Sequence, residues 1–299
     1  MYKLSNILKI VLHFNILVCL SSFCQCLIVL YGANFLEEKK HYFCKIMQHI
    51  KTFFRLLWRV WFALLAGIPI IVFAPLILIS IVFDIQWLFT FFKYIWANFI
   101  LFFMGFWTKV DYQTKVDKKR SYIMIANHTS ILDIFVNLKL FRKPFVFVGK
   151  ASLSKLPIFG YLYKKSNVMV DRNSPRSKKE VINQVEHFVV KGNSICIYPE
   201  GGIPEDTSIV LGRFKTGAFR MAIENQLPIL PMLFFDNKTK FPYSLFKGFP
   251  GRLNVKILPV IETKGLTFDD LNSLVEYTYT IMYNELMNYQ IAQKFDKQK

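Results

Sequence analysis

Hydrophobic positions divide the chain into two parts at about residue 106. Before that point apolar residues form long runs, and the longest, residues 61–83, contains no charged residue. At about 1.5 Å per residue a helix of this length crosses a hydrocarbon core of about 30 Å. We therefore predict a membrane helix over 61–83. Basic residues ahead of it (Lys51, Arg55 and Arg59) predict that its N-terminal side is cytoplasmic.

Two weaker apolar segments flank this run. Residues 7–30 carry several polar side chains, and no cleavage pattern for a signal peptide follows them, so residues 1–46 are interpreted as an N-terminal hydrophobic extension. Residues 85–106 are rich in aromatic residues and interrupted by Lys93. This pattern predicts either a second span or a helix lying in the membrane interface. Residues 47–106 are thus predicted to be membrane-anchoring helices.

After Trp107 short apolar runs alternate with polar stretches of helical periodicity. Runs rich in Val, Ile, Phe and Tyr predict strands at 121–127, 145–149, 167–171, 194–199, 228–235 and 253–261. Helices are predicted at 175–191, 216–225 and 269–293. The alternation is typical of an α/β domain, with a mixed sheet and flanking helices, preceded by the N-terminal hydrophobic membrane helices. We place this domain at 107–262 and a C-terminal helix at 263–299.

Composition adds a strong positive charge to this picture. The formal net charge is +18, although 53% of the residues are hydrophobic. A basic surface suits nucleic acid, anionic lipid or a phosphorylated substrate, and the apolar N-terminal part favours lipid. The chain has no helix-turn-helix or aromatic RNA-binding pattern, so nucleic acid is not predicted as a partner. The five cysteines have no paired spacing, which argues against a disulfide framework and a zinc site.

Candidate chemistry begins where the first predicted strand of this domain ends, in the stretch "ANHTSILD" at 126–133. Ser130 and Asp133 have the Ser-x-x-Asp spacing of a helix-capping box. His128 is not explained by a cap. One turn of loop can bring its ring to the Asp133 carboxylate, which would keep one ring nitrogen protonated and leave the other free as a general base.

A second polar loop follows another predicted strand, in "ICIYPEGGIP" at 195–204. Glu200 is followed by two glycines, which allow a sharp turn and a close approach of backbone N–H groups to a ligand. Taken alone, this stretch is equally consistent with a plain turn. Two polar loops at two strand ends favour a shared site, because α/β folds bind ligands at strand ends.

The two loops resemble motifs of a known family, the 1-acylglycerol-3-phosphate acyltransferases and related glycerolipid acyltransferases. "NHTSILD" resembles the family's Asn-His-x-Ser-x-x-Asp motif, and "YPEGG" resembles its Phe-Pro-Glu-Gly motif. Further segments agree in order and spacing: "GKASLSKLPIFG" (149–160) with "VMVDR" (168–172), "FKTGAFRMA" (214–222) and "LPILPM" (227–232). The likeness covers residues 107–235.

This resemblance implies acyl transfer from a fatty acyl thioester, on coenzyme A or acyl carrier protein, to the sn-2 hydroxyl of lysophosphatidic acid. It implies that His128 is the general base and that Asp133 orients the imidazole. Glu200 and Gly201 would shape the acceptor site, and Arg172 would lie near anionic groups. No metal and no cofactor beyond the thioester co-substrate is implied. Ser130 as a covalent nucleophile is the weaker alternative, because a cap already explains it.

One departure from the family pattern concerns the acceptor. The family motif commonly continues Glu-Gly-Thr-Arg, whereas this chain has Gly202 and Ile203, and an isoleucine cannot pair with phosphate. Either Arg213 and Lys215 supply the missing charge, or the acceptor is another lysolipid, such as a lyso-ornithine lipid. We favour the first.

The sequence is thus interpreted as that of a membrane-bound O-acyltransferase of phospholipid biosynthesis that makes phosphatidic acid. Its catalytic domain is expected on the cytoplasmic face of the membrane, the inner membrane in a bacterium. The expected partners are the acyl thioester, lysophosphatidic acid and membrane lipid. An alternative of a different class is a non-catalytic membrane protein that binds anionic lipid, in which the two loops are only caps and turns.

Overall fold

The computed structural model describes residues 33–156, 159–171, 174–204, 206 and 208–296, with only the backbone for the helical residues 33–40 and 175–179. The apolar segment predicted at 7–30 lies outside the described residues. The chain divides into two compact units, Met1–Leu57 and Trp58–Lys299. The described part of the first unit is the beginning of helix α2 (Ala33–Val82). The second unit contains the remaining elements.

A seven-stranded sheet forms the centre of the second unit, in the order β1-β7-β6-β2-β5-β3-β4. Neighbouring strands are parallel except β6 and β7, which are antiparallel. The strands are β1 (Phe106–Tyr112), β2 (Ile123–Ala126), β3 (Phe145–Lys150), β4 (Val168–Val170), β5 (Ser194–Ile197), β6 (Ile229–Phe234) and β7 (Gly251–Ile257). The prediction of a mixed α/β sheet with flanking helices is confirmed.

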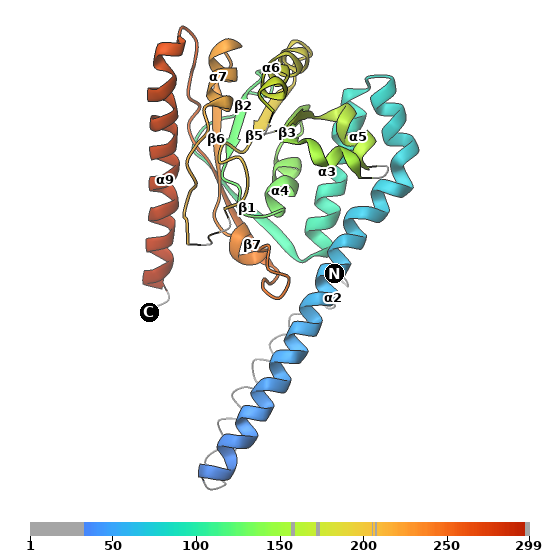
Figure 1. The fold of residues 1–299 in the computed structure, drawn as a ribbon, viewed down its shortest axis with the longest axis vertical. Coiled ribbons are helices and arrows are strands. Elements are labelled where there is room, and N and C mark those ends of the chain that lie inside the picture. The colour runs from blue at the N-terminus through green and yellow to red at the C-terminus, as the bar shows by residue number, and fades with distance from the viewer. Residues whose placement is uncertain (1–32, 157–158, 172–173, 205, 207, 297–299) are drawn as a thin grey trace. The chain divides into compact units, whose positions relative to one another are not determined.

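Helices cover both faces of this sheet (Figure 1). Besides α2 they are α3 (Gln86–Phe103), α4 (Leu132–Leu140), α5 (Phe159–Ser166), α6 (Pro175–Val190), α7 (Gly217–Glu224), α8 (Asn237–Lys240) and α9 (Leu271–Asp296). Short 3-10 helices occupy Ala151–Lys155 and Phe268–Asp270.

The central strand β2 shows how the two faces are built. Met124 and Ala126 pack into one buried cluster with α3 and α4, and Ile123 and Ile125 pack into the other with α6, α7 and α9. Successive side chains on a strand point to opposite faces, and here both faces are covered. All four residues of β2 are therefore apolar and completely buried. This continuous apolar run is the pattern from which the strand was predicted.

The N-terminal helices differ from the predicted membrane segments in their boundaries. The predicted span at 61–83 is the second half of α2, which runs without a break through the boundary predicted at 46/47. No glycine or proline occurs between Ala33 and Ala66 to end the helix earlier. Within the described part of the chain, His41–Val82 is the one segment long and apolar enough to span a membrane, by length and composition.

Helix α3 corresponds to the predicted apolar segment 85–106, and it is partly a core helix. Ala97, Ile100 and Leu101 are completely buried, and the helix contacts α4 and β1. Its opposite face exposes large apolar side chains, among them Trp87 and Phe91. The chain then turns into β1, a strand that the sequence did not reveal because its first residues end an aromatic run. The division of the chain into domains stays a prediction.

Candidate active site

The candidate site lies where three neighbouring parallel strands end. Strands β6, β2 and β5 are adjacent and run in the same direction, so their C-terminal ends meet at one edge of the sheet. The loop after β2 carries His128, the loop after β5 carries Glu200, and the turn after β6 carries Asn237. The two loops quoted from the sequence are therefore brought together, and a third segment joins them.

His128 and Asp133 form the predicted pair. Nδ1 of His128 lies 2.9 Å from Oδ2 of Asp133. A carboxylate oxygen only accepts hydrogen bonds, so Nδ1 carries a proton, and in the neutral imidazole Nε2 keeps its lone pair. None of the described residues makes a hydrogen bond to Nε2. The His128 side chain is 18% exposed, and that of Asp133 is completely buried. The imidazole is thus open to a small reactant while its orienting carboxylate is protected from water.

The capping box proposed for Ser130 and Asp133 is half present. Oδ2 of Asp133 accepts the backbone N–H of Ser130 at 2.9 Å and that of Thr129 at 2.7 Å. Oγ of Ser130, however, accepts the N–H of Leu132 and donates to the carbonyl oxygen of Phe241. The Asp133 carboxylate therefore both closes the turn at the start of α4 and holds the imidazole, which explains the spacing of five residues.

Asn237 is a site residue that sequence reasoning missed. Its Nδ2 donates to Oδ1 of Asp133 at 2.7 Å, and the side chain is completely buried. Asn237 follows β6, which lies next to β2 in the sheet, while the two residues are far apart in sequence. Asn127 strengthens the same junction, because its side-chain amide bonds both the N–H and the carbonyl oxygen of Phe234. The signal available beforehand was the polar pair Asp236-Asn237 directly after a predicted strand.

The Tyr198 ring packs against one face of the His128 imidazole. The two rings stack with centroids 4.0 Å apart and an interplanar angle of 14°. The Tyr198 hydroxyl oxygen accepts a hydrogen bond from Nδ2 of Asn137. Burial raises the pKa of Tyr198 well above its ordinary value, so its hydroxyl stays neutral. The ring therefore restricts His128 to the orientation in which it faces Asp133.

Glu200 is a bridge between backbone segments. Its Oε1 accepts the N–H of His128, and its Oε2 accepts the N–H of Gly212, both at 2.7 Å. Burial raises the pKa of Glu200, and these two N–H groups act in the opposite direction. Both carboxylate oxygens are thus engaged by the protein, and in this geometry Glu200 fixes the position of His128.

The other predicted binding residues lie around the turn after β5. Gly201 has a positive φ of 79°, and a Cβ at this position would lie 2.5 Å from Nζ of Lys215. The ammonium group of Lys215 therefore sits directly over the turn. Arg213 is exposed on the same segment, and its charge acts on Tyr279 of α9. Arg172 lies outside the described residues.

No group of three or more His, Cys, Asp or Glu side chains suitable for a metal ion occurs in the described ranges. The sequence prediction that the site holds no metal stays a prediction. The chemistry visible in this site is that of an oriented base with a nearby cation. Such a site suits proton transfer from a hydroxyl group of an anionic reactant.

Comparisons with known proteins identify relatives of this chain. The family model described as Acyltransferase matches residues 108–234. The chain is 30% identical over 175 residues to 1-acyl-sn-glycerol-3-phosphate acyltransferase of Escherichia coli (strain K12), covering 58% of this chain and 70% of that one. It is 32% identical over 169 residues to the protein of the same name from Cocos nucifera, covering 55% of this chain but only 53%, about half, of that relative.

A solved structure shares the fold. The crystal structure of the 1-acyl-sn-glycerophosphate (LPA) acyltransferase from Thermotoga maritima superposes with a TM-score of 0.65, covering 81% of this chain and 98% of that one. The identity is 19%, so this likeness concerns the architecture alone. It extends beyond the residues that the sequence motifs cover.

Proposed function

Because this chain belongs to the 1-acylglycerol-3-phosphate acyltransferase family, we propose that it moves a fatty acyl group from an acyl thioester to the sn-2 hydroxyl of 1-acylglycerol-3-phosphate. The product is phosphatidic acid. The observation that carries the proposal is the contact of 2.9 Å between His128 Nδ1 and Asp133 Oδ2, which leaves Nε2 without a hydrogen-bond partner among the described residues.

Direct transfer requires one base. Nε2 of His128 accepts the proton of the acceptor hydroxyl as its oxygen attacks the thioester carbonyl carbon. The tetrahedral intermediate then collapses, the carbon–sulfur bond breaks, and the thiolate leaving group takes the proton from His128. Asp133 stabilises the imidazolium while the proton resides there and does not itself take it up. Since Ser130 Oγ donates to the Phe241 carbonyl oxygen, a covalent acyl-serine is not part of the proposal.

Lys215 is the proposed partner of the acceptor phosphate. It lies over the Gly201 turn, close to the loop that carries the base, where the family's usual arginine is replaced by Ile203. Lysine binds phosphate as a point charge and can reach it from several directions. Arg213 is the less favourably placed cation, because it lies toward Tyr279. We therefore expect Lys215→Met to raise the KM for lysophosphatidic acid more than Arg213→Met does.

The acceptor distinguishes this proposal from its nearest alternative. If Lys215 does not serve the phosphate, another lysolipid, such as a lyso-ornithine lipid, is the acceptor. Supplying one labelled acyl thioester with each acceptor in turn, to membranes that carry the protein, measures the preference directly. A higher kcat/KM for the phosphate-free acceptor would identify that lipid, and not lysophosphatidic acid, as the acceptor. The same assay with acyl-coenzyme A and acyl carrier protein assigns the donor.

Exposed apolar surface supports placement at a membrane. The second half of α2 exposes Ile71 and Val72. The loop 241–250 exposes Tyr243 (72%) and Leu245 (54%). This loop is tied to α2 by Arg59, whose Nη2 donates to the carbonyl oxygens of residues 242, 244 and 247. Because Ser130 also bonds this loop at Phe241, the proposed bilayer contact adjoins the catalytic edge, where a lysolipid would arrive. The cytoplasmic face is the proposed side.

The central experiment compares wild-type and His128→Ala protein in membranes. Loss of a general base lowers the rate by about 10²–10⁴-fold. A matched control is His187→Ala, because His187 lies on α6 away from this edge. Equal transfer by wild type and His128→Ala, with lipid binding retained, would favour the non-catalytic lipid-binding protein instead.

A further inference from the structure

A large cavity lies at the edge of the sheet opposite His128. It has a volume of about 1000 Å³ and is lined by Tyr122 and Ser194, at the N-terminal ends of β2 and β5, and by residues that follow β1 and end α4. Strand β2 separates Tyr122 from His128 by six residues. At about 3.3 Å per residue this is roughly 20 Å.

Closely packed core separates this cavity from the catalytic loop. Met124 and Phe145 form its inner wall, and behind them Ala126 and Cys196 are completely buried. Both Ala126 and Cys196 belong to the apolar cluster beneath α4. The cavity is therefore a separate site and not an extension of the space in front of His128.

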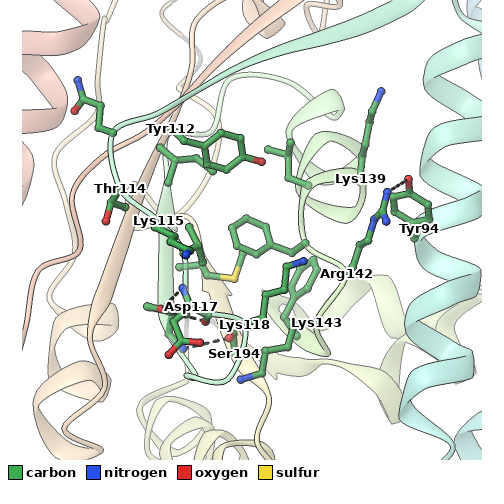
Figure 2. Close-up of a pocket in the computed structure, with 18 residues that line it drawn as sticks. Tyr94, Tyr112, Thr114, Lys115, Asp117, Lys118, Lys139, Arg142, Lys143 and Ser194 are labelled. Atoms are coloured by element: carbon green, nitrogen blue, oxygen red, sulfur yellow. Dashed lines mark hydrogen bonds between the residues drawn. The ribbon is translucent and has the colours of Figure 1, made fainter.

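Positive charge dominates the walls. Five basic residues line the cavity against one carboxylate, Asp117. They come from two segments, the loop after β1 and the end of α4 with the residues that follow it (Figure 2). These five are Lys115, Lys118, Lys139, Arg142 and Lys143. In the described residues none of the five forms an ion pair with a carboxylate.

Two of these cations bond uncharged groups, and one of the two, Lys143, also lies in the field of the Asp117 carboxylate. Nη2 of Arg142 donates to the hydroxyl of Tyr94, and Nζ of Lys143 donates to the carbonyl oxygen of Arg120. Lys139 is half-buried at the C-terminal end of α4. Burial lowers the pKa of both Lys139 and Lys143. Five cations against one carboxylate leave the lining with a net positive charge, so the free energy of the cavity improves when an anionic group binds.

Aromatic rings supply the other half of the surface. Tyr94, Tyr112, Tyr122, Phe141 and Phe145 line the same cavity. Rings of this kind pack against acyl chains and stack on planar bases, and they contribute most of the binding free energy in amphipathic pockets. A small inorganic anion alone would leave them unoccupied.

We propose that this cavity binds a phosphorylated ligand, with its phosphate held by basic residues of the lining and its apolar portion against the rings. The chemistry is a phosphate mono- or diester joined to an apolar group. An anionic lipid and an adenine nucleotide both have this chemistry. The proposal is independent of the acyl-transfer reaction, because no residue of the catalytic edge takes part.

The test is calorimetric titration of the full chain in detergent with two probes, dihexanoyl phosphatidic acid and adenosine 3′,5′-bisphosphate. The variant Lys139→Gln/Arg142→Gln/Lys143→Gln removes three charges from the cavity. The control Arg252→Gln/Lys264→Gln/Lys294→Gln removes three exposed charges elsewhere. We expect about a tenfold or greater weakening of at least one probe in the first variant and less than a twofold change in the control. Binding of phosphatidic acid at the catalytic edge would persist in both variants as a separate class of site.

A second variant distinguishes loss of binding in the cavity from loss of folding. Thr114→Trp fills the cavity from the loop after β1 and changes no charge. It is expected to abolish the same binding event while the melting temperature stays near that of the wild type. Loss with phosphatidic acid alone assigns a lipid, and loss with the bisphosphate alone assigns a nucleotide. If neither probe binds more weakly to the cavity variants than to the control, the proposal is wrong, whether or not the protein transfers acyl groups.

Discussion

Replacing Asn237 by leucine tests whether the third segment of the site supports the proposed catalytic pair, His128 and Asp133. The Asp133 carboxylate accepts four hydrogen bonds, and three of them reach Oδ2, from His128 Nδ1 and the N–H groups of Thr129 and Ser130. The fourth, from Asn237 Nδ2, is the only one to Oδ1 from the described residues. Because Asp133 is completely buried, water cannot replace the lost donor.

The size of the effect follows from this geometry. A hydrogen bond to a charged group contributes about 1.5–3 kcal/mol. If most of this is lost when the carboxylate must hold a charged imidazolium, kcat falls about ten- to hundredfold, since about 1.4 kcal/mol corresponds to a factor of ten. The KM for the acceptor should change little, because Asn237 lies behind Asp133 as seen from His128. We therefore predict that Asn237 is a positioning residue.

The assay is transfer of a labelled acyl group by purified protein at varied acceptor concentration, with thermal unfolding measured in parallel. The matched control is Asn193→Leu. Asn193 is also buried, but it lies at the opposite end of β5, where it donates to the carbonyl oxygen of Phe188. Both variants should lower the melting temperature, and only Asn237→Leu should lower kcat. An equal kcat for the two variants would show that Asn237 is merely structural.

Three further predictions concern the turn after β5. Tyr198→Leu removes the ring stacked on His128 and should lower kcat/KM about three- to tenfold, since such ring pairs contribute about 0.5–1.5 kcal/mol, whereas Tyr198→Phe should retain most activity. Burial raises the pKa of Glu200 in the folded state, so the folded chain binds the proton of this carboxyl more tightly than the unfolded chain does. Glu200 therefore stabilises the fold at a pH below its unfolded-state pKa. This stabilisation is lost as the pH rises through the raised folded-state pKa. Glu200→Gln should remove that slope from the difference between melting curves recorded across this range, and an unchanged slope would contradict the assignment. Gly201→Ala should cost about 1–2 kcal/mol in chemical denaturation, because φ is 79° and the new Cβ meets Lys215, whereas Gly217→Ala, which has open space, should cost nothing.

The strands that carry the site were predictable because their sequence signals are local. Strand β2 and strand β5 are short apolar runs, each followed at once by polar residues. Ligand sites at the ends of such strands are the rule for this architecture, so the two loops could be paired before the sheet was known. His128 and Asp133 could be predicted to be partners because only one turn of chain separates them.

Strand β1 could not be predicted, for a physical reason. Phe106 and Trp107 continue the aromatic pattern of α3, and the hydrogen-bonding partner that makes this segment a strand is β7, near the other end of the domain. Pairing over such a distance leaves no periodic signal in the segment itself. The predicted boundaries of α2 were wrong for another reason. Hydropathy shows where a helix enters apolar surroundings, and it does not show where the helix begins.

Asn237 shows why a site is harder to predict than the strands that carry it. Its role depends on β6 lying beside β2, and that order is set by packing of both faces of the sheet rather than by any residue near Asn237. Once β6 and β2 are neighbours, Asn127 bonds the β6 backbone at Phe234, and Asn237 is carried to Asp133 a few residues later. The contact between His128 and Asp133 thus depends on a short local segment, whereas the support that Asn237 gives to Asp133 depends on the strand order. Substitutions that loosen the contact between β2 and β6, such as Asn127→Ala, should therefore lower kcat along with stability.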